Sequence, residues 1–125
     1  AIQNNSMGTE GELVTLISTF HRGGTKVIAD VVINHAGDQD RTNLMKQDFG
    51  TEYGSFEPNS TWITSNDEEQ GHAQLGSHPD DGWEPNANYA SARDWDHQNT
   101  NVQNMCKAYL KFLKGKMKYD GYRFD

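Results

Sequence analysis

Arg123 and Asp125 are the first candidates for chemistry, because they lie two positions apart in a stretch that reads DGYRFD at residues 120–125. Asp-Gly is typical of a turn, and the residues that follow are typical of a short strand. Side chains alternate along a strand, so Arg123 and Asp125 share one face while Tyr122 and Phe124 share the other. A neighbouring guanidinium keeps a carboxylate charged and oriented, which suits nucleophilic attack better than proton donation. An ordinary surface ion pair at a strand end would give the same pattern, so this stretch alone leaves both interpretations open.

A second candidate strand ends in two polar residues. Residues 26–35 read KVIADVVINH, a nearly continuous apolar run rich in Val and Ile. Such a run is typical of a parallel strand buried on both faces. We expect Asn34 and His35 at its carboxyl end, on opposite faces and with different neighbours. In a parallel barrel, the carboxyl ends of the strands carry the catalytic residues.

Three stretches together resemble the α-amylase family, glycoside hydrolase family 13. The sequences DVVINH at residues 30–35 and GYRFD at residues 121–125 are similar to the first and second signature regions of that family. Between them, DWDHQN at residues 94–99 is similar to the family's Asp-x-Asp-His/Leu-x-Asn stretch before the third barrel helix. The order and spacing of the three agree with the family, and the resemblance covers essentially the whole chain. It implies a (β/α)8 barrel and a glycoside hydrolase.

The sequence predicts an amphipathic helix before each of the two strands. Thr9 and Glu12 form a capping box, and Gly23-Gly24 is expected to end the first helix by supplying positive φ angles. For the second helix, Asn99 is the expected N-cap. The apolar faces comprise Leu13, Leu16, Ile17 and Phe20 in the first helix, and Val102, Met105, Cys106, Tyr109, Leu110, Leu113 and Met117 in the second. We interpret both stripes as core packing.

We therefore expect an α/β chain that forms part of a (β/α)8 TIM barrel, from its second helix to its fourth strand. Two parallel strands alone would leave both sheet edges uncovered, so we expect the remainder of the barrel to be required. The expected parts are a barrel part at residues 1–35, an inserted B-type domain at residues 36–93 and a second barrel part at residues 94–125. The insert is far longer than an ordinary connection, and its scattered aromatic residues favour a small irregular domain over disorder.

A calcium site is expected where this insert meets the barrel. Ca²⁺ takes six to eight oxygen ligands from carboxylates, amides, backbone carbonyls and water. By resemblance, Asn34 and Asp94 match calcium ligands of the family. Asp80, Asp81 and Asn86 in the insert are weaker candidates, because the match to the family shifts there. Alternatively, Asn34 caps a strand and Asp94 a turn.

The five histidines do not predict a zinc site, because their spacing fits no ligand pattern and the chain has one cysteine. By resemblance, His35 hydrogen-bonds the sugar ring at the bond to be cleaved. Cys106 has the spacing of a small buried core residue, and no internal disulfide is possible, so the redox compartment stays open.

The resemblance implies a retaining α-glucan hydrolase of the α-amylase type that cleaves internal α-1,4-glucosidic bonds. Asp125 matches the family's nucleophile, which forms a covalent glycosyl–enzyme intermediate, and Arg123 would orient it. The matching acid/base Glu and the second catalytic Asp lie on later strands of the family and are not in this sequence, so we expect the chain alone to be inactive. The alternatives are a catalytically inactive, calcium-dependent carbohydrate-binding relative and a transglycosylase of the same family. A small doubly wound anion-binding domain ranks far lower, because no phosphate-cradling glycine motif is present.

The composition of the chain limits the classes of partner that it could bind. The formal net charge of −7 argues against nucleic acid, which requires a basic surface. No apolar run has the length of a membrane span, and no signal peptide is recognised. Starch, glycogen or a maltooligosaccharide is the implied substrate, and a secreted or periplasmic location is implied by resemblance alone.

Overall fold

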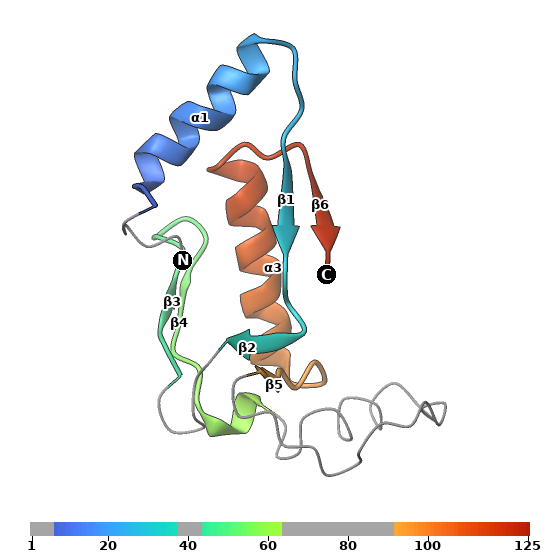
Figure 1. Cartoon of the computed structure of the whole chain (residues 1–125). Coiled ribbons are helices and arrows are strands. Elements are labelled where there is room, and N and C mark those ends of the chain that lie inside the picture. Colours follow the sequence, from blue (N-terminus) through green and yellow to red (C-terminus); the bar gives the residue numbers. More distant parts are fainter. Residues whose placement is uncertain (1–6, 38–43, 64–91) are drawn as a thin grey trace, which may run out of the picture. The chain divides into compact units, whose positions relative to one another are not determined.

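The structure is a computed structural model that describes residues 7–37, 44–63 and 92–125. It divides into two compact units, which are described separately below. Unit 1 comprises Ala1–Val32, Asp48–Ser55 and Cys106–Asp125, and unit 2 comprises Ile33–Gln47 and Phe56–Met105. The elements in chain order are α1 (Glu10–Arg22), β1 (Ile28–Val31), β2 (His35–Gly37), β3 (Gln47–Asp48), β4 (Ser55–Phe56), the 3-10 helix η1 (Ser60–Trp62), β5 (Ala92–Asp94), α3 (Thr100–Gly115) and β6 (Gly121–Phe124) (Figure 1).

Helix α1 begins and ends as the sequence predicts. The Thr9 hydroxyl accepts a hydrogen bond from the Glu12 amide at 3.2 Å, and the Glu12 carboxylate accepts one from the Thr9 amide at 2.7 Å. This reciprocal pair is a capping box, so that prediction is confirmed. The expected positive φ occurs at Gly24, at 78°, whereas Gly23 has a φ of −81°.

Strands β1 and β6 form a parallel pair in unit 1, side by side and pointing the same way (Figure 1). Asp30 pairs with Arg123 and Val31 with Phe124. Burial alternates along β1: Ala29 and Val31 are buried, whereas Ile28 and Asp30 are exposed. One face of β1 is therefore covered, and the other face carries Asp30.

The prediction of one strand through residue 35 was wrong in its carboxyl-terminal part. Strand β1 ends at Val31, where its partner β6 also ends. Beyond that point the carbonyl of Asn34 accepts a hydrogen bond from the Trp95 amide at 3.0 Å, and His35 begins strand β2. The apolar run therefore serves two pairings, because its first part joins β6 and its last residues join the segment around β5.

Helix α3 begins at the predicted cap. The Asn99 side chain accepts from the Asn101 amide at 2.9 Å, and the Asn99 carbonyl accepts from the Gln103 amide at 3.1 Å. Of the predicted stripe, Val102, Met105, Leu113 and Met117 are buried and Cys106, Tyr109 and Leu110 are partly buried. Phe112, which was not predicted, is 1% exposed and is among the most deeply buried side chains. Exposed Lys107, Lys111 and Lys114 lie at helical spacing away from this stripe.

An aromatic cluster holds the segment Asp48–Ser55 against the second half of α3 within unit 1. The ring of Phe49 lies 5.7 Å from those of Tyr109 and Phe112, and Tyr53 meets Phe112 edge-on at 5.9 Å. Aromatic pairs at these distances contribute roughly 0.5–1.5 kcal/mol beyond their buried area. A side chain at position 115 would collide with the Tyr53 ring, which accounts for glycine there.

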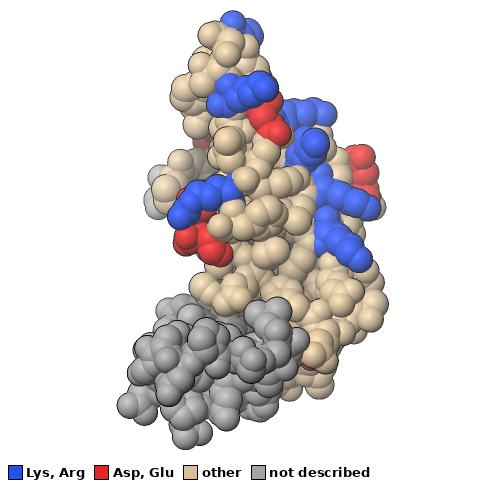
Figure 2. Space-filling view, turned by 90° about the vertical axis from the view of Figure 1, so that its right-hand side faces the viewer, with Lys and Arg blue, Asp and Glu red and all other residues tan. Residues whose placement is uncertain are grey.

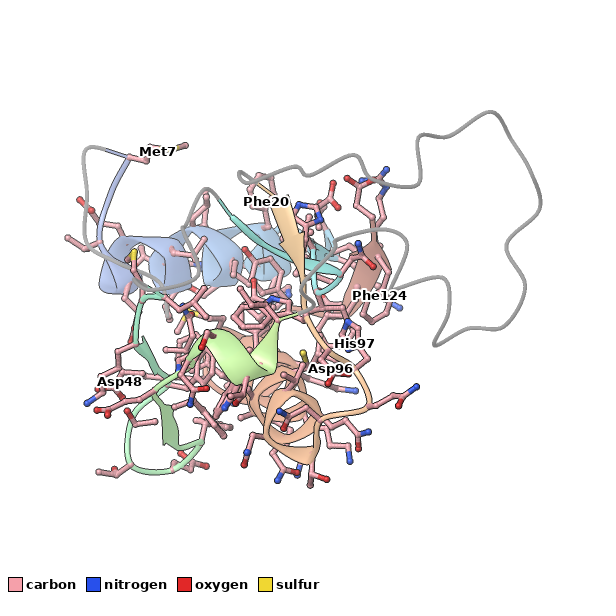
Figure 3. All side chains as sticks on the ribbon, turned by 90° about the horizontal axis from the view of Figure 1, so that it is seen from below. Met7, Phe20, Asp48, Asp96, His97 and Phe124 are labelled. Atoms are coloured by element: carbon pink, nitrogen blue, oxygen red, sulfur yellow. The ribbon has the colours of Figure 1, made fainter. Side chains whose placement is uncertain are left out.

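Unit 1 also exposes several large apolar side chains. They are Leu16 and Phe20 on α1, Ile28 and Val32 at β1, and Phe124 on β6. Of the predicted α1 stripe only Ile17 is fully buried, at 1% exposure. Figure 3 labels Phe20 and Phe124 among the described side chains. The face expected to be core in α1 is therefore largely uncovered among the residues that the structure describes.

Unit 2 contains the antiparallel pair of β2 and β5. A bridge between Ile63 and Trp95 extends the contact, and the Asp96 amide donates to the Trp62 carbonyl at 2.8 Å. The side-chain amide of Asn99 donates to the Thr61 carbonyl at 3.2 Å. These bonds join the segment around η1 to the residues that lead into α3.

Surface charge of both signs occurs on the face drawn in Figure 2, where basic side chains stand among fewer acidic ones. None of the described helices combines the length and apolarity needed to cross a membrane.

Candidate active site

Three charged side chains, called here the charged trio (Asp30, Arg123 and Asp125), meet on the exposed face of the β1–β6 pair. Arg123 Nη1 donates to both carboxylate oxygens of Asp30, at 2.8 and 2.7 Å. Arg123 Nη2 donates to Asp125 Oδ1 at 2.8 Å. The guanidinium therefore bridges a carboxylate on the neighbouring strand and one on its own strand.

The strands position this trio through their register. Asp30 is the direct Cα partner of Arg123, and the Asp125 amide donates to the Val31 carbonyl at 3.0 Å. The predicted sharing of one face by Arg123 and Asp125 is confirmed by their ion pair. On the other face, the Tyr122 hydroxyl donates to the Leu110 carbonyl at 2.6 Å. Two carboxylates thus hold Arg123 on one face of the strand pair. On the opposite face, the Tyr122 hydrogen bond fastens the same strand to α3.

The charged trio fixes the orientation of its two carboxylates, and it contributes little to the stability of the fold. The three side chains are 62%, 60% and 59% exposed, in the order Asp30, Arg123 and Asp125. Exposed ion pairs are screened by water and contribute little to folding. The hydrogen bonds that Arg123 donates to Asp30 and the negative charge of Asp125 raise the pKa of Arg123, so the guanidinium keeps its charge. A permanently charged, planar group gripping two carboxylates fixes their directions.

Sequence reasoning did not assign a role to Asp30. The signal available was its position as the single charged residue between Val27 and Ile33, in an otherwise apolar run. Alternation along the strand predicts that Asp30 lies on an exposed face, and only the pairing of the strands identifies Arg123 as its partner.

The other predicted residues lie on the β2–β5 pair in unit 2. His35 is the direct Cα partner of Asp94, and Asn34 lies one position further, bonded through its carbonyl to the Trp95 amide. Residues far apart in the sequence are therefore neighbours in one antiparallel ladder. Asp96 and His97 follow where the chain enters α3 (Figure 3).

The side chains that would complete a metal site are mostly outside the described residues. Asp80, Asp81 and Asn86 all lie there. Within the described ranges, no group of three or more His, Cys, Asp or Glu side chains is arranged to hold a metal ion. Asn34 lies just before the ladder, next to His35, the partner of Asp94, so the backbones of Asn34 and Asp94 are close together. Their amide and carboxylate oxygens are donors that fit Ca²⁺ rather than Zn²⁺.

Comparison with known proteins identifies the family. A family model described as "Alpha amylase, catalytic domain" matches residues 2–125. The chain belongs to the α-amylase family. A stretch of 48 residues is 35% identical to the "Periplasmic alpha-amylase" of Escherichia coli (strain K12). That match covers 38% of this chain and 7% of the relative, so the chain spans only a small part of that protein.

Membership of the α-amylase family indicates the fold class and the class of chemistry. The α-amylase catalytic domain is a TIM barrel that carries glycoside hydrolase chemistry, and the described residues supply helices and a parallel strand pair in keeping with it. The charged trio lies at the carboxyl end of the parallel strands, the end at which TIM barrels carry their active sites.

Proposed function

We propose that this chain contributes the nucleophile to a retaining glycoside hydrolase of the α-amylase type, and that Asp125 is that nucleophile. The observation that carries the proposal is the bond from Arg123 Nη2 to Asp125 Oδ1 at 2.8 Å, at the carboxyl end of the parallel pair. An oriented, charged carboxylate suits attack on an electron-poor anomeric carbon. The substrate we propose is an α-glucan, cleaved at internal α-1,4 bonds.

The reaction needs two carboxyl groups about 5–5.5 Å apart, one as nucleophile and one as acid/base. With Oδ1 of Asp125 held by Arg123, Oδ2 attacks the anomeric carbon. The glycosidic C–O bond breaks, and the departing oxygen takes a proton from the acid. The second carboxyl group then deprotonates a water molecule, which attacks the same carbon and releases Asp125.

Asp30 is a poor candidate for that second carboxyl group. Both of its oxygens accept hydrogen bonds from Arg123 Nη1, so both are already engaged by the guanidinium. Asp30 therefore serves to orient Arg123. We assign the acid/base role to a residue outside this sequence, on a later strand of a complete barrel.

The β2–β5 pair has a second role in this proposal. Asn34 and Asp94 hold a Ca²⁺ ion that fastens the insert to the barrel, with Asp80, Asp81 and Asn86 as further candidate ligands. Asp94 pairs with His35, and the Trp95 amide donates to the Asn34 carbonyl, so the backbones of Asn34 and Asp94 lie close together, which supports this assignment. When bound, the ion supplies a structural cross-link between distant parts of the chain. His35, opposite Asp94, contacts the sugar at the cleaved bond.

In the complete domain, we propose, this chain runs from the second barrel helix to the fourth barrel strand, with the B-type insert between. The exposed apolar side chains of α1 and β1 support such an arrangement, since neighbouring barrel elements would cover them. We propose a periplasmic or secreted location, which the similarity to the periplasmic Escherichia coli protein supports.

Trapping of the covalent intermediate tests the assignment directly. The full-length protein that contains these residues is incubated with an activated 2-deoxy-2-fluoro or 5-fluoro glucoside, digested and mapped by mass spectrometry. We expect the label on Asp125, and no label in the Asp125→Asn variant. A label on any other residue contradicts the proposal, and so does full hydrolytic activity of Asp125→Asn.

A further inference from the structure

The register of the β1–β6 pair is not specified by its apolar pattern. Residues around Asp30 form a run of Val, Ile and Ala, so sliding β1 by two residues would keep similar side chains on each face. Such a slip moves one strand by about 6.6 Å relative to the other. Arg123 would then lie opposite Ile28 or Val32 instead of Asp30. Most backbone hydrogen bonds could form again, so side-chain contacts must exclude the slipped pairing, and the contact of Arg123 with Asp30 is one of them.

A polar contact at the amino end of the pair adds to that specificity. The Asp120 amide donates to the Val27 carbonyl at 2.8 Å, and Asp120 Oδ2 accepts from the Val27 amide at 2.7 Å. His21 Nε2, in the last turn of α1, lies 2.7 Å from the same carboxylate oxygen. We call these residues (His21, Val27 and Asp120) the Asp120 clamp. All three belong to unit 1.

The clamp depends on one pairing. A slip by two residues would separate Asp120 from Val27, leaving the Val27 amide and the His21 ring without this carboxylate. The Val27 amide and, next, the His21 side chain lower the pKa of Asp120, so the contact is made by the charged carboxylate. Hydrogen bonds to a charged acceptor are stronger and shorter than neutral ones. The His21 and Asp120 side chains are 33% and 32% exposed, so they are partly shielded from water.

We propose that Asp120, held by His21, fixes the register of the β1–β6 pair and is thereby a positioning residue for the charged trio. This inference rests on the proposed function, because its effect is on the placement of Asp125. At the amino end of the β1–β6 pair, the Asp120 clamp selects the register. At the carboxyl end, this register places Arg123 opposite Asp30.

Substitutions in the full-length protein separate register from general stability. Asp120→Ala removes both side-chain contacts, Asp120→Asn keeps a carbonyl oxygen for the Val27 amide, and His21→Gln keeps a donor that His21→Ala lacks. Asp48→Ala is the matched control. Asp48 is an exposed aspartate of unit 1 whose Oδ1 accepts from the Gly50 amide at 2.9 Å, away from the β1–β6 pair. All variants are assayed on maltooligosaccharide well below their melting temperatures.

We expect kcat of Asp120→Ala to fall at least tenfold while KM stays within twofold, because misplacing the nucleophile acts on the transition state. Asp120→Asn and His21→Gln should keep most of the activity, His21→Ala should lose less than Asp120→Ala, and Asp48→Ala should match wild type. Hydrogen exchange of the Val27 amide should accelerate at least tenfold in Asp120→Ala, whereas in Asp48→Ala it should be unchanged.

A double-mutant cycle decides between register and a merely structural role. If Asp120 acts through the trio, Asp120→Ala combined with Asp30→Asn should lose less activity than the product of the two single losses, because both substitutions misplace Arg123. Multiplicative losses would overturn the proposal, as would a wild-type kcat in Asp120→Ala. If Asp120→Ala does not fold, the cycle is run with His21→Ala and the same outcomes apply. Full activity of Asp125→Asn would instead overturn the proposed function.

Discussion

The chain contains two strand pairs that end in polar residues, and they fix those residues in different ways. In the parallel β1–β6 pair, protein groups alone hold the side chains: Arg123 bonds Asp30 and Asp125 at 2.7–2.8 Å. In the antiparallel β2–β5 pair, the backbone ladder brings His35 opposite Asp94, while no metal-binding cluster forms among the described residues. The first pair is preorganised by charge, whereas for the second we propose that a Ca²⁺ ion gathers the oxygen atoms.

This difference predicts which pair carries the reaction and which carries stability. Preorganised charge acts where charge changes during a reaction, so substitutions in the β1–β6 pair should lower kcat. A site completed by a metal ion adds its binding free energy to folding, so substitutions in the β2–β5 pair should lower the melting temperature.

The largest expected effect is that of Asp125→Asn in the full-length protein. The amide keeps the shape of the side chain but cannot attack the anomeric carbon as a carboxylate does. We expect kcat on α-1,4-glucans to fall on the order of 10⁴-fold, in the range seen when a nucleophile is removed. Binding of a maltooligosaccharide, measured by calorimetry, should largely survive, because the nucleophile acts mainly in the transition state. Loss of binding in parallel with kcat would show that Asp125 holds the substrate instead.

A smaller loss is expected when the partners of Asp125 are changed. Arg123→Lys replaces a planar fork that reaches two carboxylates with a single ammonium, and Asp30→Asn removes the charge that holds the fork. We expect kcat to fall by roughly 10–100-fold in each, as for residues that orient a catalytic group. The melting temperature should change little, because these exposed ion pairs contribute little to stability. Differential scanning calorimetry beside steady-state kinetics measures both. A large drop in melting temperature with unchanged kcat would reverse the roles assigned to the two strand pairs.

The sequence predicted the features that depend on contacts between residues close together in the chain. It did not predict the features that depend on contacts between distant segments. Local signals succeeded: the Thr9–Glu12 capping box and the Asn99 cap each need only a few neighbouring residues. The shared face of Arg123 and Asp125 followed from strand alternation within three residues. These features need no knowledge of which segments pair.

Long-range pairing was the part that the sequence could not supply. The roles of Asp30 and Asp120 depend on the register between strands far apart in sequence, and the pairing of His35 with Asp94 depends on a segment that follows about sixty residues later. Phe112 was missed as a core residue because its burial comes from Phe49 and Tyr53, which arrive from a segment without a helical or strand period. The predicted ligands Asp80, Asp81 and Asn86 stay predictions, since they lie outside the described residues.

The third-largest expected effect is a lower melting temperature after calcium removal, and it should depend on the β2–β5 pair alone. An ion that binds only the folded state at 100 times its Kd adds about 2.7 kcal/mol to the free energy of unfolding. In a full-length domain this corresponds to a melting temperature roughly 5–10 °C higher with calcium than after chelation. Asp94→Ala should abolish the difference, and Asp30→Asn, its control in the other strand pair, should keep it. An Asp94→Ala variant that gains as much from calcium as wild type does would remove Asp94 from the ligand set.

The smallest expected effect is a pH dependence that belongs to the β1–β6 pair alone. The Val27 amide, and after it the His21 side chain, lower the pKa of Asp120 below its ordinary value of 3.8. A carboxyl group whose pKa is lower in the folded state adds stability above its unfolded pKa and loses it as the pH falls through the folded value. Wild type should therefore melt above Asp120→Asn at pH 7, and the gap should close as the pH falls below 3.8. Thermal melts from pH 7 to pH 3 measure this gap, with Asp48→Asn as the control. A gap that stays constant over this range would mean that the Asp120 clamp acts through its hydrogen bonds without its charge.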